Sequence, residues 1–269
     1  MLKKTLPMLA VAIMFCAGTA QATAIHDANL FTGNTLTSND DSSTGLVNLG
    51  FTANFYGTGY SQLYVNNNGN VTFNAALSTF TPFDLLSTAT PIIAPFFADV
   101  DTRNSNNVQY GSGTLNGNNV FGVNWIDVGY YSVHNSPVNS FQLILTDRSD
   151  TGAGNFDIEF NYDQILWETG DASGGNNGLG GDSARAGWSD GVANAFELPG
   201  SAINGALLDN GTNALIGGSL NSNEPGRYIF SVRNGNVVPP NPVPEPATML
   251  LFGTGLAGLA GLRRRQGKK

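Results

Sequence analysis

The chain has 269 residues, of which 41% are hydrophobic and 12% are charged, against about 25% charged in typical soluble domains, so amide, hydroxyl and glycine residues must cover much of its surface. The part from Asp27 to Glu245 carries five arginines, no lysine and all 20 acidic residues, a formal net charge of about −15. This charge argues against nucleic acid as a partner, because phosphate backbones are bound by clustered lysines and arginines.

The N-terminal segment, residues 1–22, is predicted to be a cleavable secretory signal peptide. It has a positively charged start, an apolar run at residues 6–17 and an A-x-A cleavage site at Ala20-Gln21-Ala22. Cleavage after Ala24 satisfies the same rule, so both positions stay open. The only cysteine, Cys16, lies inside the signal, and the exported protein is therefore expected to hold no disulfide.

Residues 23–238 are predicted to fold as a single all-β domain, an antiparallel β-sandwich. Apolar residues at positions 156, 158, 160 and 162 alternate with polar ones, as in a strand with one face in the core and one in water. The same alternation recurs in three further stretches, at Phe121, Val123 and Trp125, at Phe141, Leu143 and Leu145, and at Tyr228, Phe230 and Val232. Short alternating stretches between Gly- and Asn-rich turns, without helical periodicity, favour a sandwich.

Two turn signals stand out within this domain. Leu63 and Val65 are followed by Val71 and Phe73 through the sequence Asn-Asn-Asn-Gly at residues 66–69. Asn-Gly between alternating apolar runs is the strongest short-range hairpin signal, so a hairpin is expected here. The glycine-rich residues 170–181 predict a long loop.

The stretch PIIAPFFADVDTR, residues 91–103, combines the pattern of a buried strand with charge. Its first half is apolar, and it continues without a break into Asp99 and Asp101, followed by Arg103. Buried charges must be paired or hydrogen-bonded. The stretch therefore predicts a strand that leaves the core at a polar network in which Arg103 is the nearest counter-charge.

This stretch closely resembles the signature of the nidogen-like extracellular domain, with Phe97 where that family often has Trp. The signature positions are Pro95, Phe97, Asp99, Asp101 and Arg103. Later blocks similar to the family follow in the same order: VNWIDVGYY (123–131), NSFQLILTD (139–147), FDIEFNYDQILWETGDASGG (156–175), ARAGWSDG (184–191), ELPGS (197–201) and PGRYIF (225–230). The resemblance covers about residues 91–233 and implies extracellular cell-matrix adhesion, because animal members occur in basement-membrane and other matrix proteins.

The C-terminus is predicted to be a sorting signal. Residues 239–246 form a proline-rich linker that favours an extended polyproline II spacer, and residues 247–269 combine a short hydrophobic transmembrane helix with a basic end. The tail resembles the PEP-CTERM sorting signal of Gram-negative bacteria. Its motif residues are Pro244, Glu245 and Pro246, and its basic residues are Arg263, Arg264 and Arg265.

The resemblance to PEP-CTERM proteins implies a processing enzyme of the exosortase type as a partner. Such an enzyme removes the tail in the inner membrane, after which the protein moves to the cell surface or to the exopolysaccharide matrix. The alternative is an ordinary C-terminal anchor, which has no need of the Pro-Glu-Pro motif.

Two patterns are compatible with catalysis but lack its context. Residues 187–191 fit G-x-S-x-G, yet a nucleophile elbow needs a strand-turn-helix and a later histidine, whereas His26 and His134 both precede the serine. Asp157 and Glu159 would lie about 6.6 Å apart on one strand face, at the lower end of the range for inverting glycosidases. A turn between strands and a solvated strand face are the simpler interpretations, and no enzymatic activity is predicted.

No bound cofactor is predicted, but the residue types do not exclude calcium bound by oxygen ligands. Two histidines, with no cysteine outside the signal, argue against a zinc site. Asp99 and Asp101 could supply oxygen ligands for Ca²⁺, with Asn104 and Asn106 close by in sequence, although the spacing is not that of an EF-hand. A hydrogen-bond network without metal is the alternative interpretation of these residues.

These observations predict a secreted bacterial surface or extracellular-matrix protein that binds an extracellular polysaccharide or a surface protein. A carbohydrate-binding module for the exopolysaccharide, with or without a requirement for Ca²⁺, is the second hypothesis, and a secreted hydrolase is the third. A glycan array separates the first two, and a screen for esterase and glycosidase activity tests the third.

Overall fold

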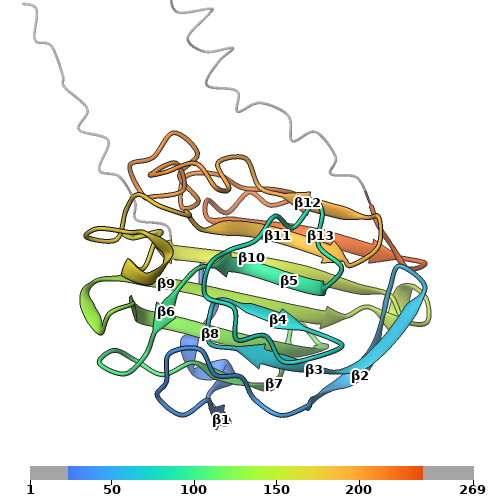
Figure 1. The fold of residues 1–269 in the computed structure, drawn as a ribbon. Coiled ribbons are helices and arrows are strands. Elements are labelled where there is room, and N and C mark those ends of the chain that lie inside the picture. Colours follow the sequence, from blue (N-terminus) through green and yellow to red (C-terminus); the bar gives the residue numbers. More distant parts are fainter. Residues whose placement is uncertain (1–23, 239–269) are drawn as a thin grey trace, which may run out of the picture.

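The computed structural model describes residues 24–238, which form two antiparallel β-sheets packed face to face (Figure 1). The larger sheet has eight strands, in the order β1-β7-β8-β9-β10-β13-β14, with β6 paired to β8. These strands are β1 (Asn34–Thr35), β6 (Val100–Asp101), β7 (Gln109–Leu115), β8 (Asn118–Tyr130), β9 (His134–Asp147), β10 (Phe156–Gln164), β13 (Arg227–Arg233) and β14 (Asn236–Val237).

The smaller sheet has six strands, in the order β12-β11-β5-β4-β3-β2. They are β2 (Val47–Phe55), β3 (Thr58–Asn66), β4 (Asn70–Thr72), β5 (Pro91–Phe97), β11 (Arg185–Asp190) and β12 (Ala195–Glu197). Within residues 24–238 the helical segments are three short 3-10 turns, η1 (Ala28–Phe31), η2 (Ser149–Thr151) and η3 (Asp171–Ser173). The predicted all-β fold is confirmed, and the core that the two sheets share makes it a β-sandwich.

The four predicted alternating stretches become neighbouring strands of the larger sheet. Phe160 of β10 lies opposite Leu143 of β9 on one side and Tyr228 of β13 on the other. Leu143 in turn lies opposite Val123 of β8. Because these residues are in register, the apolar side chains of four strands share one face of the sheet.

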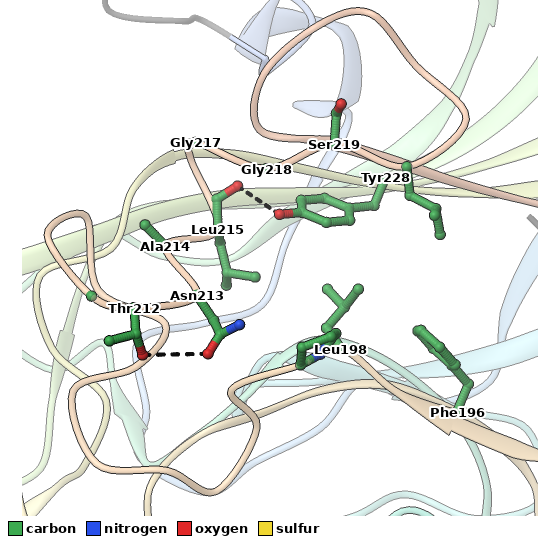
Figure 2. Close-up of a pocket in the computed structure, with 13 residues that line it drawn as sticks. Phe196, Leu198, Thr212, Asn213, Ala214, Leu215, Gly217, Gly218, Ser219 and Tyr228 are labelled. Carbon is green, nitrogen blue, oxygen red and sulfur yellow. Dashed lines mark hydrogen bonds between the residues drawn. The ribbon is translucent and has the colours of Figure 1, made fainter. Parts of the chain in front are cut away.

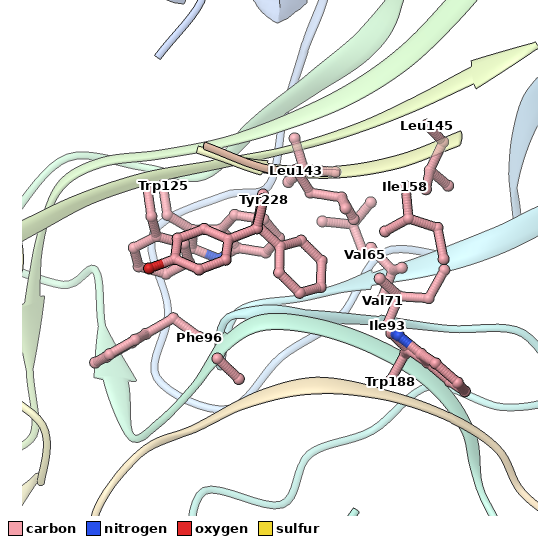
Figure 3. Close-up of a cluster of buried hydrophobic side chains, with 14 of the residues drawn as sticks. Val65, Val71, Ile93, Phe96, Trp125, Leu143, Leu145, Ile158, Trp188 and Tyr228 are labelled. Carbon is pink, nitrogen blue, oxygen red and sulfur yellow. The ribbon is translucent and has the colours of Figure 1, made fainter. Parts of the chain in front are cut away.

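That face packs on the smaller sheet to form the main hydrophobic core (Figure 3). Phe96 of β5 lies against Phe141 of β9 with ring centroids 5.3 Å apart, and Trp125 of β8 stacks on Phe141 at 5.2 Å. Ring pairs at such distances add to the stabilisation that apolar burial provides. Figure 3 shows between the sheets the side chains of Val65, Val71, Ile93, Leu143, Leu145 and Ile158.

The other face of β10 is not the solvated face that the alternation predicts. Glu159 is 8% exposed and pairs with Arg227 at 3.0 Å and with His26 at 2.8 Å. Asp157 pairs with Arg233 at 2.7 Å. The reason is that the N-terminal segment crosses this face and covers it, which the residues of β10 alone could not reveal.

The predicted hairpin is confirmed, but its turn is buried. β3 and β4 pair with Asn66 opposite Asn70, and the four asparagines of residues 66–70, the asparagine turn, are at most 1% exposed. Gly69 has a φ of +70°, and a Cβ there would lie 1.7 Å from the carbonyl oxygen of Phe96. Only glycine combines this backbone conformation with this close approach.

The predicted signal peptide and the predicted tail, with its transmembrane helix, lie outside the described residues. None of the helices within residues 24–238 has the length and apolar character that a membrane crossing requires. Ala24 is fully buried, and its carbonyl oxygen accepts a hydrogen bond from Arg227 at 2.6 Å. Cleavage after Ala22 would keep this contact in the domain, whereas cleavage after Ala24 would remove it.

Replacing Gly69 by alanine should prevent the domain from folding, because the new Cβ would meet a backbone oxygen held in the centre of a sheet. Gly117→Ala is the matched control, since Gly117 also has a positive φ in a hairpin turn but has open space around its Cβ position. The control should lose only about 1–2 kcal/mol of unfolding free energy, the strain of a left-handed residue. Urea unfolding followed by tryptophan fluorescence measures both, and equal losses would contradict this account.

Candidate functional site at an acidic corner

The stretch at residues 91–103 runs out of the core into two buried carboxylates. Every residue of β5 is buried, and Asp99 and Asp101 are 1% and 0% exposed. Within β5, the Pro95 carbonyl accepts a hydrogen bond from the Tyr162 hydroxyl at 2.6 Å, which ties this strand to the opposite sheet. Phe97 points to the outer side of the smaller sheet, in an apolar cluster with Leu85 and Ile92.

Asp101 and Arg103 form an ion pair. Arg103 donates from Nε to Oδ1 of Asp101 at 2.9 Å and from Nη2 to Oδ2 at 2.5 Å, and the backbone N–H of Val133 also donates to Oδ2, at 2.9 Å. Burial by itself raises the pKa of Asp101, but these hydrogen bonds outweigh burial and lower the pKa below its ordinary value. Both carboxylate oxygens of Asp101 are therefore in use.

Asp99 lies in a different environment. Side-chain oxygens of Asp40, Asp41 and Asp99 lie within 4.8 Å of one another, and we call these three residues the acidic corner. Arg103 reaches the corner through Oδ2 of Asp40, at 3.1 Å. Oδ1 of Asp40 and Oδ2 of Asp99 are buried without a hydrogen-bond partner among the described residues.

Burial and the repulsion between neighbouring carboxylates raise the pKa values of Asp99 and Asp40. Burial, followed by the charges of Asp40 and Asp41, raises the pKa of Asp99 to about 7. Burial, followed by the charges of Asp101 and Asp41, raises the pKa of Asp40 to about 6, although Arg103 acts in the opposite direction. The ionised corner is therefore electrostatically unfavourable unless it gains a positive charge.

The asparagine turn joins the two halves of the corner. Asn68 donates from Nδ2 to Oδ1 of Asp41 at 2.9 Å, and its Oδ1 accepts from the backbone N–H of Val100 at 3.0 Å. Asn67 donates from Nδ2 to the carbonyl oxygens of Asp40 and Val100. The loop that carries Asp40 and Asp41 is thus fixed beside the chain that leaves β5.

Asp40 and Asp41 are the corner residues that the sequence analysis does not identify. They lie far from Asp99 along the chain, and contacts of their loop with the asparagine turn and with Thr102 bring them to it. One signal was available, because they are the only two adjacent acidic residues in the sequence. Asn104 and Asn106, which the sequence placed near the candidate metal site, are exposed.

A separate pocket of about 560 Å³ lies among the loops that connect β12 to β13 (Figure 2). Phe196 and Tyr228 contribute aromatic surface to its wall, and Thr212 and Asn213 contribute polar groups. The Tyr228 hydroxyl donates to the carbonyl oxygen of Leu215 at 3.1 Å, which fixes the ring. No sequence motif points to this pocket, because long irregular loops build most of its wall.

A comparison with known protein families assigns this chain to a family. Residues 17–206 match the family described as NIDO related. The chain belongs to this family. The resemblance found in the sequence is thereby confirmed, and the match begins before residue 91 and includes Asp40 and Asp41 of the acidic corner.

The NIDO-related chain is similar to alpha-tectorin of Homo sapiens, with 35% identity over 228 residues, and of Gallus gallus, with 33% over 229. It is also similar to nidogen of Drosophila melanogaster, with 27% identity over 220 residues. The alignments cover 75%, 75% and 71% of this chain but only 10%, 10% and 15% of these relatives. The chain thus spans a small part of the curated relatives that it matches. No solved structure matches it.

A second match concerns the tail. Residues 242–265 match the PEP-CTERM protein-sorting motif, which confirms the second resemblance and marks the chain as a substrate of an exosortase-type enzyme. The matched range includes Pro244, Glu245, Pro246 and the arginines at 263–265, all outside the described residues. Together the two matches identify a protein that is exported to the cell surface or the extracellular space.

The G-x-S-x-G pattern does not form a nucleophile elbow. Ser189 lies within β11, is 2% exposed, and is followed by a turn and β12 rather than by a helix. The two histidines of the described chain are engaged elsewhere, His26 with Glu159 and His134 with Asp171. The strand pair that the sequence favoured is present, but the pattern itself lies mostly in β11, and only Gly191 belongs to the turn. Ser189 has no histidine to activate it in the described structure.

Without divalent cations, the stability of the protein should fall as the pH rises from about 4 to about 8. The pKa values of Asp99 and Asp40, about 7 and about 6, lie above the ordinary value of 3.8. A raised folded-state pKa means that the folded protein binds more protons than the unfolded chain in this window. The resulting stabilisation is complete below the unfolded-state pKa and is lost as pH rises through the folded-state pKa.

Urea unfolding in EGTA at pH 5 and pH 8 measures this dependence. Asp99→Asn should reduce it and should be more stable than the wild-type protein at pH 8, because it removes a buried, unpaired charge. Asp27→Asn is the control. Hydrogen bonds from Asn29 lower the pKa of Asp27, so this carboxylate stays ionised between pH 5 and pH 8. Equal pH dependence in the wild-type protein and Asp99→Asn would count against the corner as its source.

Proposed function

We propose that this chain is a non-catalytic adhesion module of the bacterial cell surface or extracellular matrix. The observation that carries the proposal is the presence on one chain of a NIDO-related domain at residues 17–206 and a PEP-CTERM motif at 242–265. The nidogen-like resemblance implies adhesion to matrix. The sorting motif supports delivery to the place where such adhesion would occur.

The chemistry of the domain supports a binding role rather than a catalytic one. The described residues hold no serine–histidine arrangement around Ser189, and Asp157 and Glu159, the pair considered for glycoside hydrolysis, are engaged with arginines. Few charges and many amide and hydroxyl groups suit recognition through hydrogen bonds. An esterase and glycosidase screen on the purified protein should therefore show no activity.

Sorting supplies a direct test of the export part of the proposal. Replacing Glu245 by alanine should leave unprocessed protein in the inner membrane, because the processing enzyme would no longer recognise its Pro-Glu-Pro motif. Truncation after Val238 should release soluble domain. Cell fractionation with immunoblotting measures both. Glu224→Ala is the control, because it removes an acidic residue of the domain and leaves the tail unchanged. If Glu245→Ala reached the surface as well as the wild-type protein, the tail would be an ordinary anchor.

A carbohydrate-binding role is the second candidate, and the pocket beside β12 and β13 favours it. Protein sites for small ligands are concave and mostly apolar, with a few polar groups that set orientation. Phe196 and Tyr228 provide ring surface, and Asn213 provides an amide, in a cavity of about 560 Å³ (Figure 2). These groups suit one or two sugar rings of an extracellular polysaccharide.

Binding assays distinguish the two candidates. If the ligand is a protein, beads that carry the purified domain should capture cell-surface material, and protease treatment of that material should abolish capture. If the ligand is a polysaccharide, the purified protein should bind a glycan array. Phe196→Ala should reduce glycan binding at least tenfold, the equivalent of about 1.4 kcal/mol, if the pocket holds the sugar. Val192→Ala is the control, because Val192 is 88% exposed and lies outside the pocket. Binding of neither material would refute both candidates.

A further inference from the structure

The described part of the chain has few positively charged residues, and every arginine in it forms an ion pair. Residues 24–238 contain five arginines and no lysine, and each arginine lies within 3.0 Å of a carboxylate oxygen. The pairs are Arg103 with Asp101 and Asp40, Arg148 with Asp150 and Asp157, Arg185 with Glu197 and Asp84, Arg227 with Glu159, and Arg233 with Asp157. Among these residues no arginine is left for Asp41 or Asp99.

Among the described carboxylates that pair with no arginine, Asp99 is deeply buried and lacks hydrogen bonds to one of its oxygens. It is 1% exposed, and its Oδ2 has no hydrogen-bond partner within residues 24–238. The loop after β10 closes over it, since a Cβ on Gly170 would lie 2.4 Å from this oxygen. A buried carboxylate oxygen without a donor is rare in folded proteins and points to a ligand that supplies positive charge.

The geometry of the corner fits one metal ion. Ca²⁺ binds oxygen ligands at 2.3–2.6 Å, so two ligands of one ion lie at most about 5 Å apart. One oxygen from each of Asp40, Asp41 and Asp99 lies within 4.8 Å of the other two. Oδ1 of Asp40 and Oδ2 of Asp99 lack donors, and Asp40 and Asp41 are only half-buried, which leaves a path from solvent.

We propose that Asp40, Asp41 and Asp99 form a Ca²⁺ site that joins the loop after β1 to the chain leaving β5. The three carboxylates supply at least three of the six to eight oxygen ligands that Ca²⁺ takes, and water supplies others on the open side. Their charge of −3, reduced by the contact of Arg103 with Asp40, leaves the attraction that a divalent cation needs.

The frame around the site is connected by hydrogen bonds that need no bound ion. The backbone N–H of Thr102 donates to the carbonyl oxygen of Asn39, and the N–H of Asn39 donates to the Thr102 hydroxyl, both at 2.9 Å. The same hydroxyl lies within donating distance of the Asn39 carbonyl, at 2.9 Å, and of Oδ1 of Asn67, at 3.3 Å. Asn68 holds Asp41 and Val100 at the same time. A site whose ligands are already in place loses little entropy on binding, so affinity in the range of extracellular calcium modules, about 10⁻⁴ to 10⁻³ M, needs no rearrangement.

Asp101 is not part of this site, which distinguishes it from the Asp99 and Asp101 pair that the sequence suggested. Both oxygens of Asp101 accept hydrogen bonds from Arg103 and Val133. Asp101 therefore anchors Arg103, which in turn contacts Asp40 from the side. A substitution at Asp101 and one at Asp99 should consequently give different calcium responses.

Thermal unfolding of the full-length protein at pH 8, in EGTA and in 10 mM CaCl₂, tests the proposal. This concentration is roughly 10 to 100 times the expected Kd. Calcium should raise the melting temperature of the wild-type protein by roughly 3 to 10 °C. Isothermal titration should give one Ca²⁺ per chain, and MgCl₂ at the same concentration should give a smaller shift, because Mg²⁺ requires shorter bonds and gives up its water reluctantly.

Matched variants assign the response to the corner. Asp99→Asn and Asp41→Asn should fold but lose the calcium shift, while Asp163→Asn, a half-buried carboxylate outside the corner, should keep it. Asp101→Asn should be less stable in EGTA yet still gain stability from calcium. Equal melting of the wild-type protein in EGTA and in calcium, or an unchanged shift in Asp99→Asn, would overturn the proposal. A magnesium shift as large as that of calcium would overturn the choice of metal.

Discussion

The asparagine turn at residues 66–70 is the constraint on which much of the structure depends. It places polar side chains and backbone between the two sheets, where a buried donor or acceptor without a partner costs about 1–3 kcal/mol. Three of its asparagines bond to different segments: Asn66 to β4, Asn67 to the loop at Asp40, and Asn68 to Val100. The fourth, Asn70, donates to the carbonyl oxygen of Asn68 within the turn. The Trp125 Nε1–H, from the opposite sheet, donates to the carbonyl oxygen of Asn67 at 2.9 Å. A turn that appears in the sequence as a surface loop is thus the point at which distant segments are joined.

The shortage of positively charged residues decides how each buried carboxylate of the domain is stabilised. With no lysine in the described chain, each buried carboxylate must take a share of five arginines or be stabilised by hydrogen bonds alone. Glu168 shows the second solution, because the backbone N–H groups of Gly205 and Leu207 donate to it at 2.6 and 2.7 Å. Asp101 and Glu159 show the first. Asp99 has neither, and this contrast within one protein makes its environment informative.

The sequence was sufficient for the local elements and insufficient for the contacts between distant ones. Alternation predicted β8, β9, β10 and β13, because side-chain direction has a period of two in any strand. It could not predict that the outer face of β10 is covered, since this depends on where the segment before η1 crosses the sheet. The carboxylates at 99 and 101 were likewise visible, but their roles were not. Which of them receives Arg103 is decided by backbone direction after β5, and the partners of the other come from another part of the chain.

Export would change the Ca²⁺ concentration around the acidic corner and, through it, the stability of the domain. A ligand that binds only the folded state adds stability that rises with the logarithm of its concentration above Kd. If the corner binds Ca²⁺ weakly, a domain in a calcium-poor compartment carries the unrelieved repulsion of Asp40, Asp41 and Asp99, and the same domain outside the cell is relieved of it. The ion would act beside Asp99, which lies close to both the loop of Asp40 and the loop of Gly170. The first of these loops is held by hydrogen bonds from Asn67 and Asn68 of the asparagine turn. Local opening has a lower free energy in such regions than in the core, so calcium would tighten this edge of the sandwich first and leave the aromatic core between β5 and β9 unchanged.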